Sequence, residues 1–151
     1  MRIYPLVPKD DPILNDPCNG CSDFVRQDFT KLLIENMKYY GGIGLAANQI
    51  GFDERAFAME VVGEDEFIVC YNPSIIKSSS DVTTLREGCL SFPEGVTVEV
   101  ERPESVVASY EVECGIRVTR TFDGLSAKVF QHELDHLNGI LMTWYGKPER
   151  V

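Results

Sequence analysis

The segment Gln131-His132-Glu133-Leu134-Asp135-His136 constrains the fold of this chain more than any other. Residues four apart lie one turn above each other on a helix, so both imidazoles can face one metal ion if the segment is helical. Glu133 then lies about a quarter-turn from His132, near enough to reach a water on that ion without binding it. The chain has only two histidines, and both stand here. We therefore predict a metal-binding helix rather than a solvated face with two incidental histidines.

The hydrophobic periodicity predicts two main helices. Apolar residues recur at spacings of three and four over Ser22–Tyr40, which indicates a long N-terminal helix with one apolar face. The metal-binding helix is expected over Leu125–Leu137, with Asp123 as its candidate cap and Asn138-Gly139 as its end.

The segments between the two helices are rich in β-forming residues. A short apolar strand is expected at Phe67–Tyr71, ended by Asn72-Pro73. Val106–Val112 and Ile116–Phe122 should form a hairpin. The order of helix, strands and helix, without regular βαβ alternation, predicts an α+β fold of mostly antiparallel strands around the C-terminal metal-binding helix.

Charge and composition exclude several classes of protein. The 151 residues include 24 acidic and 14 basic ones, a net charge of −10, which argues against a nucleic-acid binder with a basic face. The longest uncharged stretch contains Asn48, Gln49 and glycines and does not predict a membrane span. The first ten residues lack the apolar region of a secretory signal, and five cysteines, an odd number, fit a reducing compartment.

A catalytic metal site needs a third protein ligand and an open position for water. Met142 stands where the long zinc-peptidase signature has its third histidine, and Glu149 is the only carboxylate after His136. The third ligand is therefore expected upstream, with Cys89 as the best candidate because the adjacent Gly88 permits an unusual backbone turn.

The other cysteines leave alternatives open at this point. A single buried cysteine such as Cys89 is often only core filler. Cys70 and Cys114 lie in or beside expected strands, and Cys18 and Cys21 have the spacing of a structural zinc site but lack a second pair.

Three segments together resemble the peptide deformylase family. They match its three signature motifs in order and at roughly its spacing, with agreement from about residue 5 to 145: Gly42-Ile43-Gly44-Leu45-Ala46-Ala47-Asn48-Gln49, Glu87-Gly88-Cys89-Leu90-Ser91 and Gln131-His132-Glu133-Leu134-Asp135-His136.

The resemblance implies a site for one divalent metal ion. Its protein ligands would be Cys89, His132 and His136, with water in the fourth position. The family prefers Fe²⁺ and accepts Ni²⁺, Co²⁺ or Zn²⁺, a choice that the ligand types alone could not make.

The resemblance also implies a reaction, namely hydrolysis of the N-formyl group on the initiator methionine of nascent peptides, with release of formate. Glu133 would transfer the proton of the attacking water to the departing amine. The Gln49 side-chain amide and the Leu90 backbone N–H would donate to the formyl oxygen. The residues alone favour Gln49 as a polar residue at a turn before Gly51, and only the resemblance reverses this.

The substrate pocket implied by the resemblance should accept an unbranched methionine side chain. The stem of Lys128 would line it with its ammonium in water, or the side chain would simply be exposed. Glu87 should orient the Cys89 segment, with Arg102 as its partner. The substrate-binding residues are expected to be Ile43, Gly44, Glu87, Gly88, Leu125 and Val129.

The chain is expected to form a single catalytic domain, residues 1–151, without the extended C-terminal helix of many bacterial relatives. That helix docks some relatives on the ribosome, and ribosomal RNA would repel a net charge of −10, so both features argue against ribosome docking without excluding it. A monomer is expected, without nucleic-acid or membrane partners, in the cytoplasm of a bacterial or phage-infected cell or alternatively in an organelle.

Two other classes stay open. A metallopeptidase would use the same helix and Glu133, but it lacks a downstream third ligand here. A binding or structural module would hold the metal in a closed four-ligand site without hydrolysis.

Overall fold

The computed structural model describes residues 2–20 and 26–150 of the chain. Its helices, including two short 3₁₀ turns (η), alternate irregularly with eight strands in the described residues. In chain order the elements are α1 (Pro12–Asn15), α2 (Arg26–Tyr39), β1 (Gly44–Ala46), η1 (Ala47–Ile50), β2 (Ala56–Val61), β3 (Glu66–Ser78), β4 (Val82–Glu87), β5 (Val96–Pro103), β6 (Ser105–Glu111), β7 (Arg117–Asp123), α3 (Gly124–Leu137), η2 (Met142–Trp144) and β8 (Glu149–Arg150).

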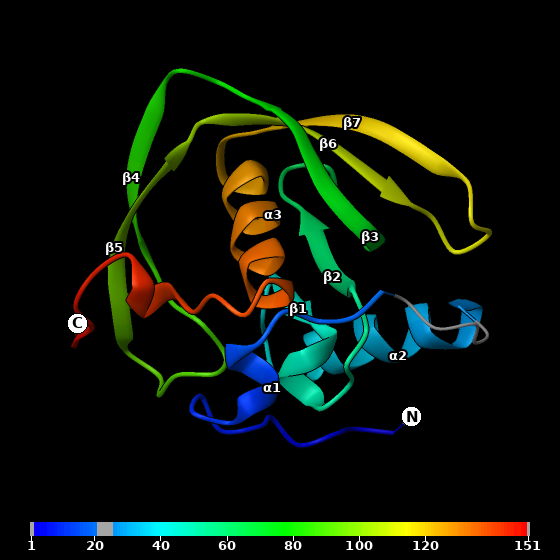
Figure 1. The fold of residues 1–151 in the computed structure, drawn as a ribbon, viewed down its shortest axis with the longest axis horizontal. Helices are drawn as coiled ribbons and strands as arrows, with labels where there is room; N and C mark the ends of the chain where they lie inside the picture. Colours follow the sequence, from blue (N-terminus) through cyan, green and yellow to red (C-terminus); the bar gives the residue numbers. More distant parts are fainter. Residues whose placement is uncertain (1, 21–25, 151) are drawn as a thin grey trace.

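The larger sheet has five strands in the order β1-β2-β3-β6-β7, and every neighbouring pair is antiparallel. The smaller sheet has the order β4-β5-β8 and is also antiparallel. The predicted α+β fold with mostly antiparallel strands is thus confirmed. Figure 1 shows α3 between the β4–β5 hairpin on one side and the larger sheet on the other.

Strand β2 is buried on both faces because α2 and α3 pack on opposite sides of it. Phe57 and Met59 lie in one apolar cluster with Phe130 of α3. Ala56 and Ala58 alternate with them and lie in a second cluster with residues of α2. Successive side chains of a strand point to opposite faces, so this alternation forms the two cores of the domain.

The smaller sheet has a core of its own, made of Phe92, Val98, Val100 and Met142. Strand β4 contributes little to it, since Val82–Arg86 are all exposed and only Glu87 is buried. β4 is therefore an edge strand that leads directly into the Cys89 segment.

The predicted end of a strand at Asn72-Pro73 is wrong. β3 continues to Ser78, because a register shift between Tyr71 and Ser74 lets the strand pass the proline. Asn72 adopts a positive φ of 45°, and its N–H donates to the carbonyl of Arg55 rather than to β6. Proline has no backbone N–H, and at a bulge of this kind it does not have to donate a hydrogen bond to the neighbouring strand.

The two predicted helices are present with shifted ends. α2 begins at Arg26 in the described residues, and the first four residues of the predicted Ser22–Tyr40 helix lie outside them. Asp123 precedes α3, but its side chain makes no capping hydrogen bond. Instead the N–H of Gly124 donates to the carbonyl of Glu104. The predicted hairpin is formed by β6 and β7, where Val106 pairs with Phe122.

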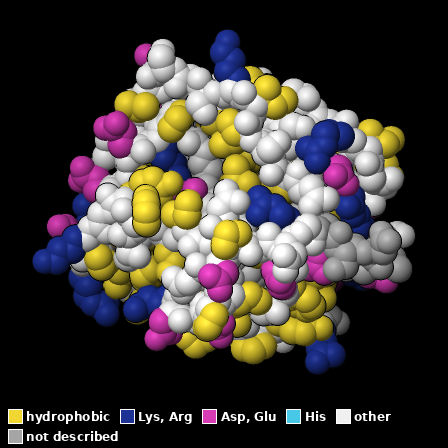
Figure 2. All heavy atoms as spheres, viewed as in Figure 1, with side chains coloured by type: hydrophobic (Ala, Val, Ile, Leu, Met, Phe, Trp, Pro, Cys, Tyr) yellow, Lys and Arg dark blue, Asp and Glu magenta, His cyan; other side chains and the backbone are white. Residues whose placement is uncertain are grey.

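The surface carries charges of both signs. On the face shown in Figure 2, both described Lys and Arg side chains and described Asp and Glu side chains are spread over the surface, with several Lys and Arg side chains close together at the lower left. Of the helices described within residues 2–20 and 26–150, none combines the length and the apolar character that crossing a bilayer requires.

The end of α3 depends on Gly139. Its φ is +76°, and a Cβ added there would lie 2.6 Å from the carbonyl carbon of Asp16. Gly139→Ala should therefore lower the free energy of unfolding in urea by about 2–4 kcal/mol, since backbone strain and steric overlap add. Gly63→Ala is the matched control: its φ is +89° with nothing within 4 Å, and it should cost only about 1 kcal/mol. Equal losses would contradict the close approach to Asp16.

Candidate metal centre and active site

Three potential metal ligands come together between β4 and α3. Cys89 lies two residues after β4 ends, and His132 and His136 lie one turn apart on α3. One ligand atom from each residue lies within 4.8 Å of the other two. Cys89 Sγ is 3.2 Å from His136 Nε2. The structure thus brings the three predicted ligands to one point.

The donor atoms fit a tetrahedral metal ion. With typical metal–sulfur and metal–nitrogen distances, the edge between a sulfur and a nitrogen ligand measures roughly 3.6 Å. The Sγ–Nε2 distance of 3.2 Å is close to this value. One thiolate and two imidazoles suit Zn²⁺ or Fe²⁺ and leave a fourth position open.

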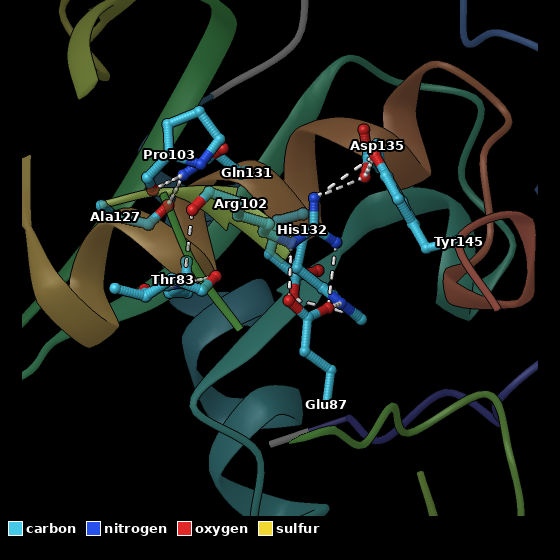
Figure 3. A network of polar contacts seen from close by, with 11 residues as sticks. Thr83, Glu87, Arg102, Pro103, Ala127, Gln131, His132, Asp135 and Tyr145 are labelled. Atoms are coloured by element: carbon cyan, nitrogen blue, oxygen red, sulfur yellow. Dashed lines mark hydrogen bonds and ion pairs between the residues drawn. The ribbon is translucent and has the colours of Figure 1, made fainter. Parts of the chain in front are cut away.

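The orientation of His132 is set by a buried ion-pair network, shown in Figure 3. Nδ1 of His132 lies 2.8 Å from Glu87 Oε1, which leaves Nε2 for a metal ion. Arg102 binds both oxygens of Glu87, at 2.5 and 2.9 Å. Its remaining Nη1 donates to Asp135 Oδ2 at 2.9 Å, and the Tyr145 hydroxyl donates to the same oxygen at 2.6 Å.

The network keeps Glu87 ionised although it is buried. Burial alone would raise the pKa of this carboxyl, but hydrogen bonds from Arg102 and His132 outweigh it and hold the pKa at about 2. A charged Glu87 accepts the Nδ1 proton of His132, which fixes the tautomer needed for metal binding at Nε2.

Glu133 lies beside the ligands without joining them. Its side chain is buried, Oε2 is 4.0 Å from His132 Nε2, and Oε1 has no hydrogen-bond partner in the described structure. A Cβ at Gly44 would lie 2.5 Å from Oε2, so the glycine makes room for the carboxyl. Burial raises the pKa of Glu133 to about 7.

Gln49 presents its amide NH₂ group to the same point. Its Oε1 accepts the backbone N–H of Ala46 at 2.9 Å, which sets the orientation of the amide. Nε2 then lies 2.9 Å from Ser91 Oγ and 3.6 Å from Cys89 Sγ. A side-chain donor therefore lies beside the potential sulfur ligand.

A cavity of about 710 Å³ opens onto these groups. Its lining includes Gln49, Cys89, Leu90, His132 and Glu133. It also includes every residue predicted to bind substrate, namely Ile43, Gly44, Glu87, Gly88, Leu125 and Val129.

The prediction that the Lys128 ammonium reaches water is wrong. Its side chain lines the cavity, but the residue is only 5% exposed. Nζ donates to the backbone carbonyl and hydroxyl of Thr83 and to the carbonyl of Arg102. The backbone acceptors of β4 and β5 compensate the ammonium for its loss of water.

The remaining cysteines lie away from this site. Burial and the charge of Asp53 raise the pKa of Cys18 to about 11, and Cys21 lies outside the described residues. Cys70 is fully buried and Cys114 is exposed. Within residues 2–20 and 26–150, Cys89, His132 and His136 form the one group of Cys, His, Asp or Glu side chains that could hold a metal ion.

Sequence reasoning missed Asp135 and Tyr145, which complete the Arg102 network. Asp135 stands near the C-terminus of α3, where a negative charge opposes the helix dipole. The unfavourable position of this carboxylate at the end of the helix was the one indication in the sequence that it pairs with a cation, which in the structure is Arg102. Tyr145 had no such signal, because its partners come from other elements.

The comparisons with known proteins agree with this geometry. The sequence model described as polypeptide deformylase matches residues 3–150. A peptide deformylase of Thermotoga neapolitana is 42% identical over 142 residues, covering 93% of this chain and 85% of that protein. The crystal structure of peptide deformylase from Thermotoga maritima has a TM-score of 0.91 at 35% identity, covering 98% of this chain and 100% of that chain.

A Met-Ala-Ser-bound crystal structure of a class I type b peptide deformylase from Acinetobacter baumannii is also similar. Its TM-score is 0.86 at 28% identity, covering 95% of this chain and 98% of that chain. The resemblance seen in the three sequence motifs is confirmed by the match along nearly the whole chain: the protein belongs to the polypeptide deformylase family of metal-dependent hydrolases.

Proposed function

We propose that this enzyme removes the N-formyl group from the initiator methionine of nascent polypeptides and releases formate. The observation that carries the proposal is the position of Glu133. Its buried carboxyl lies beside three potential metal ligands, at the wall of a cavity that could admit a peptide terminus.

The proposed cofactor is one divalent cation, Fe²⁺ by preference, with Ni²⁺, Co²⁺ or Zn²⁺ as substitutes. Cys89, His132 and His136 would hold it. A divalent cation in this position lowers the pKa of a coordinated water and polarises a carbonyl oxygen.

Glu133 is proposed to carry the proton. Its pKa of about 7 allows it to accept a proton from the attacking water and later to release it to the departing amine. Glu133 follows His132 in the sequence and packs against Gly44, so it lies near the proposed reaction site. Its Oε2 is 4.0 Å from His132 Nε2, too far for a hydrogen bond.

Gln49 and Leu90 are proposed to stabilise negative charge on the formyl oxygen. The Gln49 amide is already oriented by the Ala46 N–H, so its own N–H groups need little rearrangement as charge develops. The Leu90 backbone N–H would be the second donor. Its side chain lies close to Gly42, where a Cβ would come within 2.7 Å of Leu90 Cδ1.

The cavity is proposed to bind the methionine side chain against Leu125, Val129 and Ile43, all of which are apolar and line it. The Met-Ala-Ser ligand of the Acinetobacter baumannii relative has the sequence of such a deformylated product. Since formylated chains arise where translation begins, we propose that the enzyme acts in the cytoplasm, as a monomer.

Glu133→Gln should lower kcat for formyl-Met-Ala-Ser by roughly 10²–10⁴-fold, because the amide cannot carry the proton. Metal content should stay near one ion per chain, since Glu133 is not a ligand. A formate-coupled assay and elemental analysis on the same sample measure both. Glu64→Gln, whose side chain is 62% exposed, is the control and should keep normal activity. Loss of the metal together with the activity would refute the role of Glu133 as proton carrier. Cleavage of unformylated peptides by the wild-type enzyme would instead favour a metallopeptidase.

The iron-loaded enzyme should lose activity in air faster than the nickel-loaded enzyme. A thiolate ligand such as Cys89 is open to oxidation, and a redox-active ion promotes that reaction. Both forms are prepared anaerobically, and residual formate release is followed after exposure to air. Equal lifetimes in air would contradict the proposed involvement of iron and thiolate.

Cys89→Ser should bind either metal at least about 10-fold more weakly.

A further inference from the structure

The hydroxyl of Ser91 is a polar group beside the candidate metal centre that the proposed reaction does not use. Ser91 lies two residues after Cys89 and is half-buried. Its neighbours Leu90 and Phe92 both line the cavity, whereas Ser91, in the same described segment, does not. Ser91 is therefore not placed to touch a substrate, and a role in the reaction must act through another side chain.

That side chain is Gln49 of η1, which does line the cavity. Nε2 of Gln49 donates to Ser91 Oγ at 2.9 Å, although the two residues are 42 apart in the chain. At the other end of the same amide, Oε1 accepts the backbone N–H of Ala46, also at 2.9 Å. Gln49 is only 1% exposed, so these protein groups take the place of the water that an amide would otherwise bind.

The two contacts restrict the amide in different ways. The Ala46 contact decides which end of the amide faces Ser91, because a reversed amide would place its NH₂ group against the Ala46 N–H, and two donors do not bond to each other. It does not by itself fix the plane of the amide, since the last torsion of a glutamine side chain is broad. The Ser91 hydroxyl supplies the second fixed point.

The bond to Ser91 also determines which hydrogen of Gln49 remains for a ligand. An amide nitrogen carries two hydrogens, and one of them serves Ser91 Oγ. The other remains for the side of Cys89, whose Sγ lies 3.6 Å from Nε2. This is the side on which the formyl oxygen is proposed to bind.

We propose that Ser91 is a positioning residue for deformylation: its hydroxyl holds the Gln49 amide so that the remaining N–H meets the formyl oxygen as negative charge develops there. The inference rests on the proposed function. Donors that are oriented before the reaction stabilise developing charge without a cost of reorganisation. Without the hydroxyl, the amide rotates about its last torsion and its donor is misdirected in part of the molecules.

The test is a double-mutant cycle between Ser91 and Gln49, with kcat and KM for formyl-Met-Ala-Ser measured by formate release from nickel-loaded enzyme. Ser91→Ala should lower kcat about 3–10-fold, as expected for one neutral hydrogen bond. KM should stay within about 2-fold, because Ser91 does not touch the substrate. Gln49→Leu should lower kcat roughly 10²–10³-fold. In the Gln49→Leu background, Ser91→Ala should change kcat by less than about 2-fold.

A matched pair of variants separates the hydroxyl from the size of the side chain. Ser91→Thr keeps the hydroxyl, whereas Ser91→Val has the same shape without it. The kcat of Ser91→Thr should exceed that of Ser91→Val at least about 3-fold, and this pair decides alone should Ser91→Ala not fold. Ser80→Ala is the control: Ser80 is exposed between β3 and β4, and its replacement should leave kcat at the wild-type value.

A second measurement detects the contact without any turnover. The side-chain amide signals of Gln49 are followed by NMR in isotope-labelled, zinc-loaded enzyme, where their absence from Gln49→Leu assigns them. The amide hydrogen bound to Ser91 should exchange with solvent at least about 3-fold faster in Ser91→Ala than in the wild type. It should keep the wild-type exchange rate in Ser91→Thr.

The outcomes distinguish this inference from the proposed function. A wild type that releases no formate refutes the proposed function, and the role of Ser91 in that reaction falls with it. An active wild type in which Ser91→Ala lowers kcat equally in both Gln49 backgrounds leaves the function standing and overturns the positioning role. Unchanged exchange in Ser91→Ala, or equal kcat for Ser91→Thr and Ser91→Val, overturns it as well. A loss of kcat confined to the native Gln49 background, together with faster exchange, supports it.

Discussion

The buried ion pair between Arg102 and Glu87 is the interaction on which the site depends. It joins β5 to the end of β4, and Glu87 in turn binds His132 on α3. Burying two charges costs free energy that only close geometry and further hydrogen bonds recover. Glu87 accepts two hydrogen bonds from the guanidinium and Asp135 accepts one, and their oxygens are shared with His132 and Tyr145. The pair therefore orients His132, one of the three potential metal ligands, and links β4 to β5.

The same arrangement explains why neighbouring carboxyls differ. Glu87 faces a cation and stays ionised, with a pKa of about 2. Glu133, equally buried, faces Gly44 and has one oxygen without a partner, and its pKa is about 7. One carboxyl is thereby suited to orienting a ligand and the other to transferring a proton.

The sequence allowed accurate prediction where the signal was local or repeated. The helix with both histidines, the β6–β7 hairpin and the grouping of Gln49 and Glu133 with the ligands agree with the structure. Prediction failed where a distant partner overrides a local rule. β3 passes Pro73 because Asn72 bonds to Arg55, seventeen residues earlier in the chain. Lys128 is buried because β4 and β5 supply acceptors that no pattern in α3 reveals.

The sequence by itself determined the α+β class and the helix with both histidines, because these follow from residue types at short, fixed spacings, and its three motifs determined the family and, through it, Cys89 as the third candidate ligand. Only the tertiary structure decided the Arg102 network, the burial of Lys128 and the route of β3. The first two depend on charges and backbone carbonyls of β4 and β5 that become neighbours of α3 only on folding, and the third depends on the hydrogen bond between Asn72 and Arg55.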